Sequence, residues 1–299
     1  MTDNSTFTAV DLSRLPAPSV IEALSFETIY ADMLARLQLL APGFDATVES
    51  DPAIKILQIA AYRETLLRAR VNDAARAVMP AFATGADLDH LAALFGVARL
   101  LVSPGDPETG TPPTMESDTD LRRRLVLAPE GYSVAGPEGA YIFHALSADP
   151  AVLDASATSP APGTVVVSIL ARDGDGTASP GLLAAVTAWL GAETRRPLTD
   201  DLIVQSADIT SYAVAASITT FAGPDRAIVL AQSQAQVEAY VAESRRLGRD
   251  ITRSGLFAAL HCDGVQNVTL TSPAADIVCD RTEAAFCTAI TLTYAGLGE

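Results

Sequence analysis

One short segment resembles a catalytic motif in the types and spacing of its residues. The stretch GYSVAG (131–136) places Ser133 two residues after Gly131, as in the G-x-S-x-G turn that presents a nucleophilic serine. Position 135 is Ala where the motif requires Gly, and the preceding stretch RRRLVLAPE is typical of a helix, whereas the motif follows a strand. We therefore interpret the segment as a turn between two helices.

A second segment, DGDG (173–176), supplies two carboxylates between glycines. A calcium loop needs further oxygen ligands and a bidentate Glu beyond its Gly, and the sequence provides neither. The pattern therefore indicates a turn.

The cysteines and histidines do not form a metal-binding or thiol motif (Cys262, Cys279, Cys287, His90, His144 and His261). His261 adjoins Cys262, but neighbours in a chain point to different faces, and small buried thiols are the default. The glycine patterns that hold phosphates are also missing. The sequence thus predicts no catalytic residue, no cofactor-binding residue, no cofactor and no metal site, and indicates a protein that is not an enzyme.

The composition is that of a globular protein able to form more than one hydrophobic core. The chain has 299 residues, of which 49% are hydrophobic and 19% charged. Its net charge of −16 disfavours binding to nucleic acid, because phosphates repel an acidic surface. No apolar run approaches the ~20 residues needed to cross a bilayer, and the first residues do not resemble a signal peptide. We therefore expect folding in the cytosol and no membrane insertion.

Two N-terminal helices are predicted from apolar spacing. Apolar residues recur at steps of three and four from Phe26 to Leu40, and Pro42 and Gly43 end that helix. Asp51 is placed to cap a second helix that has Pro52 in its first turn and runs to about Met79.

The second helix is apolar on two sides, which indicates packing between two neighbours. One side carries Ala53, Ile56, Leu57, Ala60, Leu67, Val71, Ala74, Ala75 and Val78. Ile59, Tyr62 and Leu66 form the second patch, among a local concentration of arginines. The helix is either the centre of its own domain or the contact to another subunit. The residues selected as candidates for a protein interface are Phe26, Met33, Ile59, Tyr62, Arg63, Leu66 and Arg70.

The remaining pattern predicts an α+β fold, with an N-terminal helical domain followed by tandem small α/β modules with mixed sheets. Helices are expected over about 87–95, from Ser117, over 137–148, 179–191, 224–248 and 254–260, and strands over 164–170, 202–209, 210–221, 265–272 and 286–296. The predicted domains are an extended arm (1–20), a helical domain (21–102), a linker (103–116), a helical connector (117–150), a first α/β module (151–222) and a C-terminal α/β module (223–299).

Several segments, in order, resemble the baseplate assembly protein J family of contractile-tailed phages. They include DLSRLPAPSVIEALSFETIYADMLARL (11–37), AYRETLLRARVNDAARAVMPAFATGADLDHLAALFGVAR (61–99), MESDTDLRRRL (115–125), GYSVAGPEGAYIFHALS (131–147), LGRDITRSGLFAALHCDGVQNVTLTSPAADIV (247–278) and FCT (286–288). The resemblance covers nearly the whole chain and depends on the joint order of the segments, because no single motif is decisive.

The resemblance implies a structural wedge subunit of a baseplate, assembled in the host bacterial cytoplasm and located in the virion tail. Its implied partners are a second copy of itself, a protein I-like wedge partner, a lysozyme-like sheath-initiating wedge protein, and central hub and spike proteins. It also implies a ring of wedges around the hub whose change of conformation triggers sheath contraction. The alternative function is a virion-associated peptidoglycan-degrading enzyme of the tail tip.

Overall fold

The structure is a computed structural model that describes residues 12, 15–16, 18, 20–44, 48–223 and 225–298. It divides into two compact units, which we name the N-terminal unit (Val10–Ala98) and the C-terminal unit (Arg99 onward). Most of the extended arm expected over residues 1–20 lies outside the described residues. Along the part of the chain that the structure describes, no helix is both long enough and apolar enough to span a bilayer.

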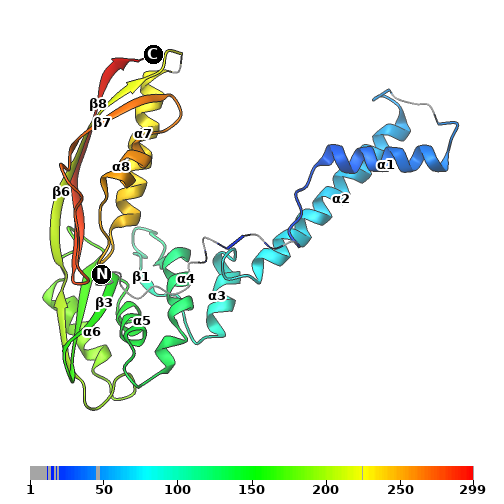
Figure 1. The fold of residues 1–299 in the computed structure, drawn as a ribbon. Helices are drawn as coiled ribbons and strands as arrows, with labels where there is room; N and C mark the ends of the chain where they lie inside the picture. Colours follow the sequence, from blue (N-terminus) through cyan, green and yellow to red (C-terminus); the bar gives the residue numbers. More distant parts are fainter. Residues whose placement is uncertain are drawn as a thin grey trace. The chain divides into compact units, whose positions relative to one another are not determined.

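The N-terminal unit consists of three helices, α1 (Phe26–Leu40), α2 (Pro52–Ala77) and α3 (Gly85–Ala93). The Asp51 side chain accepts a hydrogen bond from the Ala53 amide and Pro52 occupies the first turn, so the predicted start of α2 is confirmed. Helix α2 ends two residues before the predicted Met79, and α3 begins two residues before the predicted Asp87. Helix α1 packs against α2 (Figure 1).

Helix α2 buries little of its apolar surface within its own unit. Its buried residues are Ile54, Ala61 and Asn72, which lie along one side of the helix. Most large side chains of the two predicted apolar sides are exposed instead, namely Ile56, Ile59, Tyr62, Leu66, Leu67, Val71 and Val78. Within this unit α2 is therefore not enclosed on two sides by neighbouring helices.

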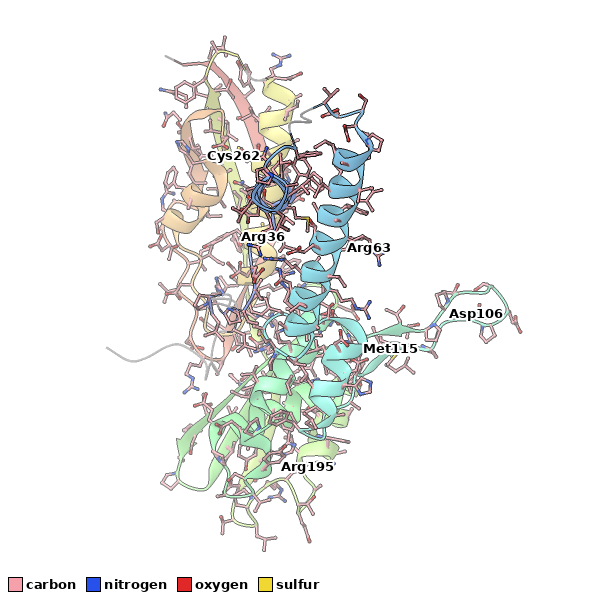
Figure 2. All side chains as sticks on the ribbon, turned by 90° about the vertical axis from the view of Figure 1, so that its right-hand side faces the viewer. Arg36, Arg63, Asp106, Met115, Arg195 and Cys262 are labelled. Carbon is pink, nitrogen blue, oxygen red and sulfur yellow. The ribbon has the colours of Figure 1, made fainter. Side chains whose placement is uncertain are left out.

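The segment predicted as a linker forms a β-hairpin. Strand β1 (Leu101–Ser103) pairs with β2 (Thr114–Met115), and Asp106 bridges to Thr111 closer to the turn. Gly105, at φ +71°, lies where a Cβ atom would meet the Thr111 carbonyl oxygen at 2.3 Å, so the turn requires glycine. The hairpin projects into solvent with Asp106 near its tip (Figure 2). Turn-rich composition does not distinguish a hairpin from a flexible connection, and the assignment of 103–116 as a linker remains a prediction.

The first sheet of the C-terminal unit has the order β3-β4-β5, with β3 antiparallel and β5 parallel to the central β4. The elements are α4 (Asp118–Leu127), η2 (Glu130–Tyr132), α5 (Glu138–Ala148), β3 (Val152–Ala161), β4 (Thr164–Ala171), α6 (Pro180–Leu190) and β5 (Asp201–Ser206). Helices α5 and α6 cover one face and share a core with β3 and β4. The sequence patterns predicted every one of these helices and strands except η2 and β3.

The second sheet has the order β7-β6-β8, with β7 antiparallel and β8 parallel to the central β6. Its elements are β6 (Asp208–Thr220), α7 (Arg226–Ser244), α8 (Arg253–Leu260), β7 (Val265–Ser272) and β8 (Glu283–Leu297). Helices α7 and α8 lie on the same face of this sheet (Figure 1). These mixed sheets confirm the predicted α+β fold class.

The predicted border between the two modules was wrong at residue 222. That border assigned β6 to the first module, but β6 is the central strand of the second sheet. Strands β5 and β6 are separated only by Ala207, so chain proximity suggested one sheet where pairing produces two. The other domain borders remain predictions.

Candidate protein-binding surface

The outward side of α2 carries a continuous row of exposed side chains. Ile56, Ile59, Leu66 and Leu67 are between 44% and 67% exposed. At about 100° per residue, these positions lie opposite the buried Ile54, Ala61 and Asn72. The apolar side chains of α2 thus face away from α1. In an ordinary amphipathic helix the apolar side faces the core of its own domain.

Two arginines lie within this row. Arg63 and Arg70 are exposed and seven residues apart, so they project from the same side of α2. Figure 2 shows Arg63 on the opposite side of α2 from the helix that carries Arg36. Among the described residues neither Arg63 nor Arg70 has an ion-pair partner, whereas Arg68 pairs with Glu22 and Glu64.

The remaining predicted interface residues occupy two other places. Tyr62 is 57% exposed at the edge of the row. Phe26 and Met33 belong to α1 and are half-buried; Phe26 stacks on Tyr30 with ring centroids 6.1 Å apart, and Met33 lines a groove of about 490 Å³ beside α2. The structure therefore brings Ile59, Arg63, Leu66 and Arg70 together, with Tyr62 at their margin, and places Phe26 and Met33 on a different surface.

A polar clamp fixes the segment before α1 onto α2. The buried Asn72 side chain accepts a hydrogen bond from the Glu22 amide at 3.1 Å and donates one to the Glu22 carbonyl at 2.9 Å. Arg68 adds an ion pair to the Glu22 carboxylate at 3.1 Å. Because the clamp and α1 occupy the inner side of α2, the outward row remains exposed.

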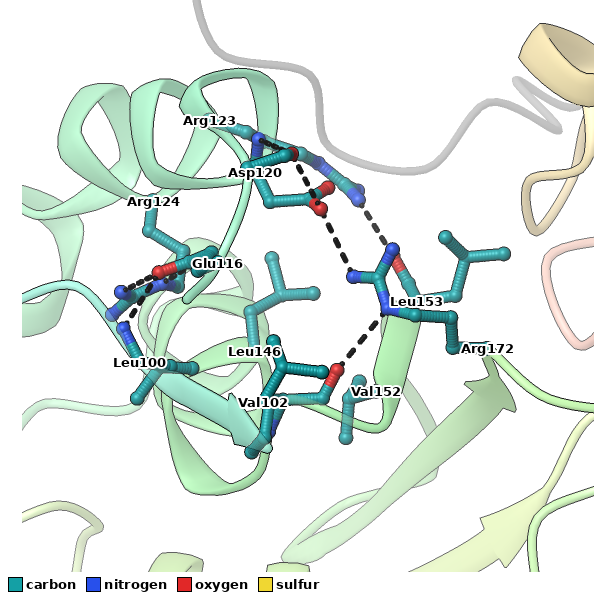
Figure 3. A pocket seen from close by; sticks show the side chains of 12 residues that line it. Leu100, Val102, Glu116, Asp120, Arg123, Arg124, Leu146, Val152, Leu153 and Arg172 are labelled. Atoms are coloured by element: carbon teal, nitrogen blue, oxygen red, sulfur yellow. Dashed lines mark hydrogen bonds and ion pairs between the residues drawn. The ribbon is translucent and has the colours of Figure 1, made fainter. Parts of the chain in front are cut away.

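The C-terminal unit contains a pocket of about 130 Å³ where α4, β1 and the start of β3 meet (Figure 3). Glu116 and Arg124 form a buried ion pair there, with 2.8 Å between Arg124 Nε and Glu116 Oε1. Glu116 also accepts the Leu100 amide at 3.1 Å. At the opposite wall, Arg172 pairs with Asp120 at 3.1 Å. Opposite charges are matched around this pocket, which makes it a structural junction.

Asp154 connects the two sheets of the C-terminal unit. Its carboxylate is buried, forms an ion pair with Arg123, and accepts the Ala155 amide at 2.8 Å and the Leu247 amide at 3.0 Å. Arg246 donates to the neighbouring Leu153 carbonyl at 3.1 Å. A residue of β3 is thereby hydrogen-bonded to the chain that precedes α8.

The segments first considered for chemistry are turns or buried groups. Ser133 Oγ accepts the Ala135 amide, and Asp175 accepts the Thr177 amide, as expected for turn residues. Burial raises the pKa of the Cys279 thiol to about 11, so this group stays protonated near neutral pH. In the ranges that the structure describes, no group of three or more His, Cys, Asp or Glu side chains is arranged to hold a metal ion.

Comparison with known proteins shows the family to which this chain belongs. Three models match successive parts of the chain: the baseplate J-like N-terminal domain at residues 49–106, the baseplate J-like central domain at 133–206, and the baseplate J-like protein C-terminal domain at 212–293. The chain belongs to the baseplate J-like family. The expected resemblance is confirmed.

Baseplate protein J of Escherichia phage P2 is 46% identical to this J-like chain, over 97% of the chain and 99% of the relative. A solved structure, the six-fold symmetrised baseplate of the anti-feeding prophage, matches with a TM-score of 0.39 and 16% identity. That match covers 59% of the J-like chain and 42% of the other chain. A TM-score this low does not show a shared fold, so the assignment to the family depends on the sequence matches.

Sequence reasoning missed the polar junctions of this J-like chain. Glu116 and Asp154 were not selected because each lies among residues typical of a cap or a loop. Their partners are eight and 31 residues away or more, and no local pattern indicates such pairs. The buried Asn72 could not be singled out either, because α2 carries many other polar residues, among them Gln58, Thr65 and Asp73.

Proposed function

We propose that this chain is a structural wedge subunit in the baseplate of a contractile phage tail or phage-tail-like particle, where it works by binding other proteins. Its relationship to a baseplate protein J over 97% of the chain supports this function. In the proposal the chain is a component of the tail in the virion, and it assembles there after folding in the host cytoplasm.

One structural observation carries the proposal. The N-terminal unit exposes large apolar side chains along α2 from Ile56 to Val71, and Val78 directly after the helix. The buried apolar residues among those described in this unit are few (Ile29, Ile54, Ala61, Ala83, Leu88, Ala92 and Val97). Contiguous exposed apolar surface on a folded protein marks a site of association. An exposed helix with so little core behind it is suited to packing in a multi-chain bundle.

The proposed partners follow from the family. They are a second copy of the chain, a protein I-like wedge partner, a lysozyme-like sheath-initiating wedge protein, and the central hub and spike proteins. Wedges that contain this chain would surround the hub as a ring, whose change of conformation would release the sheath. The extended apolar side of α2 supports assembly of this kind, since a ring requires each chain to bind neighbours through different surfaces.

Co-expression with the other tail proteins tests the proposal. The tagged chain should co-purify in a stoichiometric complex, measured by native mass spectrometry. The double substitution I59D/L66D should remove at least one component, because it places carboxylates on the exposed apolar row. The control Leu198→Asp changes a leucine of the C-terminal unit that is even more exposed, at 83%, and should leave the complex intact.

Two results would contradict the proposal. The first is a chain that stays monomeric beside its tail proteins. The second is hydrolysis of purified peptidoglycan by the chain alone, which would favour the enzymatic alternative.

A further inference from the structure

The outward side of α2 has the spacing of a coiled-coil seam. Its positions alternate in steps of three and four residues, and they are occupied by Ile56, Ile59, Arg63, Leu66, Arg70, Asp73 and Ala77. All but the half-buried Ala77 are exposed, so the seam is open for another helix. The exposed Leu67 and Val71 widen it on one flank, and Tyr62 widens it on the other.

We infer that this seam binds a helix of a different protein that carries an apolar seam of its own and two carboxylates seven residues apart, facing Arg63 and Arg70. The inference rests on the proposed function, which requires a partner, and it specifies the chemistry by which that partner is recognised.

The two arginines determine the charge of the occupant. Docking a helix on the seam would remove Arg63 and Arg70 from water, and a guanidinium left without a partner there would weaken the complex. Carboxylates of the partner would form charge-assisted hydrogen bonds with both groups. The whole chain has a net charge of −16, so an acidic partner gains no general attraction from the surface outside these two arginines.

Two neighbouring arginines of α2 form ion pairs within the chain. Arg68 lies off the seam and pairs with Glu64 at 2.6 Å and with Glu22 at 3.1 Å. Arg76 lies near Asp73 at 3.4 Å. These arginines are satisfied within the chain, whereas Arg63 and Arg70 are presented on the apolar row.

A second copy of α2 provides too few counter-charges for the two arginines of the seam. A parallel, in-register pair would oppose Arg63 to Arg63 and Arg70 to Arg70, which is repulsive. An antiparallel pair can bring Arg63 to Asp73 of the other copy, but each seam contains one carboxylate and two arginines. One arginine per helix would remain buried without a counter-charge, so a helix with two carboxylates is the better occupant.

Two synthetic helical peptides test this inference with the purified full-length chain. Both carry isoleucine and leucine at seam positions over about four heptads, and they differ only at two seam positions seven residues apart, which are Glu in one and Lys in the other. Fluorescence anisotropy measures the binding of each. The Glu peptide should bind at least about tenfold more tightly, and its affinity should fall as salt is raised.

Charge reversal on the chain provides the decisive comparison. The exposed double substitution R63E/R70E should reverse the preference, so that the Lys peptide binds more tightly, with an unchanged circular dichroism spectrum. The matched control Arg36→Glu alters an exposed arginine of α1 and should leave the preference as it was.

Equal affinity for the two peptides, or a preference that R63E/R70E does not change, would overturn the inference. Dimerisation of the chain in sedimentation that Leu66→Asp abolishes would also overturn it, by assigning the seam to a second copy. Failure of the peptide preference in a chain that still enters the tail complex would reject only this inference. Failure of the proposed function would instead appear as the absence of any complex.

Discussion

At the scale of single residues, the strongest constraint in the C-terminal unit is a buried pair of opposite charges. The side chains of Arg124 and Glu116 are 5% and 6% exposed. Desolvating two charges offsets most of their attraction, so such a pair contributes little net stability while it is complete. Its importance appears when one member is removed, because the other is left as a buried charge without a counter-charge.

The substitution Glu116→Gln should therefore lower the free energy of unfolding by roughly 3–5 kcal/mol, measured by urea denaturation. The double substitution Glu116→Leu with Arg124→Met should recover much of this loss, because it removes both charges. A double variant that is as unstable as the sum of its single variants would show that the pair does not act as a unit.

The buried His144 should make the free energy of unfolding depend on pH. Burial lowers the pKa of its imidazole below the ordinary value, helped by the charge of Arg195 and opposed by a hydrogen bond with the Gly131 backbone. Above about pH 6.5 the side chain is neutral in both the folded and the unfolded protein. As the pH falls below that value, the unfolded state takes up the proton first, so the free energy of unfolding must decrease.

Urea denaturation followed through Trp189 fluorescence should thus show a loss of stability between pH 7.5 and 5.5. His144→Gln should reduce that loss, since the variant lacks the titrating group. A loss of the same size in the variant would assign the pH dependence to other residues.

At the scale of elements, local signals in the sequence were sufficient where the cause of the structure is itself local. The pairs Asp51–Pro52 and Ser179–Pro180 predicted the starts of α2 and α6, because a cap and a first-turn proline act within one turn. The β-branched run from Thr164 predicted β4 for the same reason.

Strand β3 could not be predicted in this way. Asp154, Ser156 and Pro160 interrupt its apolar pattern, and the strand exists because it pairs with β4 and buries its polar groups against distant partners. The candidate interface on α2 shows the opposite limit. Its residues could be selected from their spacing, but only the structure shows that α1 covers the other side of the helix.

The hydrogen bonds of Asn72 to Glu22 should help to hold α1 against α2. Asn72→Ala removes both partly buried hydrogen bonds between Asn72 and the Glu22 backbone. We expect a destabilisation of about 1–3 kcal/mol and faster amide exchange across α1, measured by hydrogen–deuterium exchange. Asp73→Ala, one residue further at an exposed position, is the control. Unchanged exchange in α1 would show that packing alone holds the helix.

At the scale of the whole molecule, the C-terminal unit contains two sheets, and Asp154 of β3 links the first sheet to Leu247, which bridges to Ala284 of the second. The buried carboxylate of Asp154 accepts hydrogen bonds from Arg123 and from the Leu247 amide. Asp154→Asn should cost roughly 3–5 kcal/mol and separate thermal unfolding into two transitions, since Arg123 loses its counter-charge and the sheets lose a shared bond.

Calorimetry measures this effect, and Asp120→Asn is its control. Asp120 pairs with Arg172 and hydrogen-bonds Ser117, both outside the second sheet, so its substitution should cost about 1 kcal/mol or less and leave a single transition. Two transitions already present in the unsubstituted protein would contradict the proposed coupling.

The central claim is that this chain acts through surfaces shared with other proteins in a baseplate. Cryo-electron microscopy of intact tails tests that claim most directly. The map should show the chain in the ring around the central hub, with the side of α2 that carries Ile59, Arg63 and Leu66 covered by another chain. A baseplate from which this chain is missing, or in which that side of α2 faces solvent in every copy, would contradict the account.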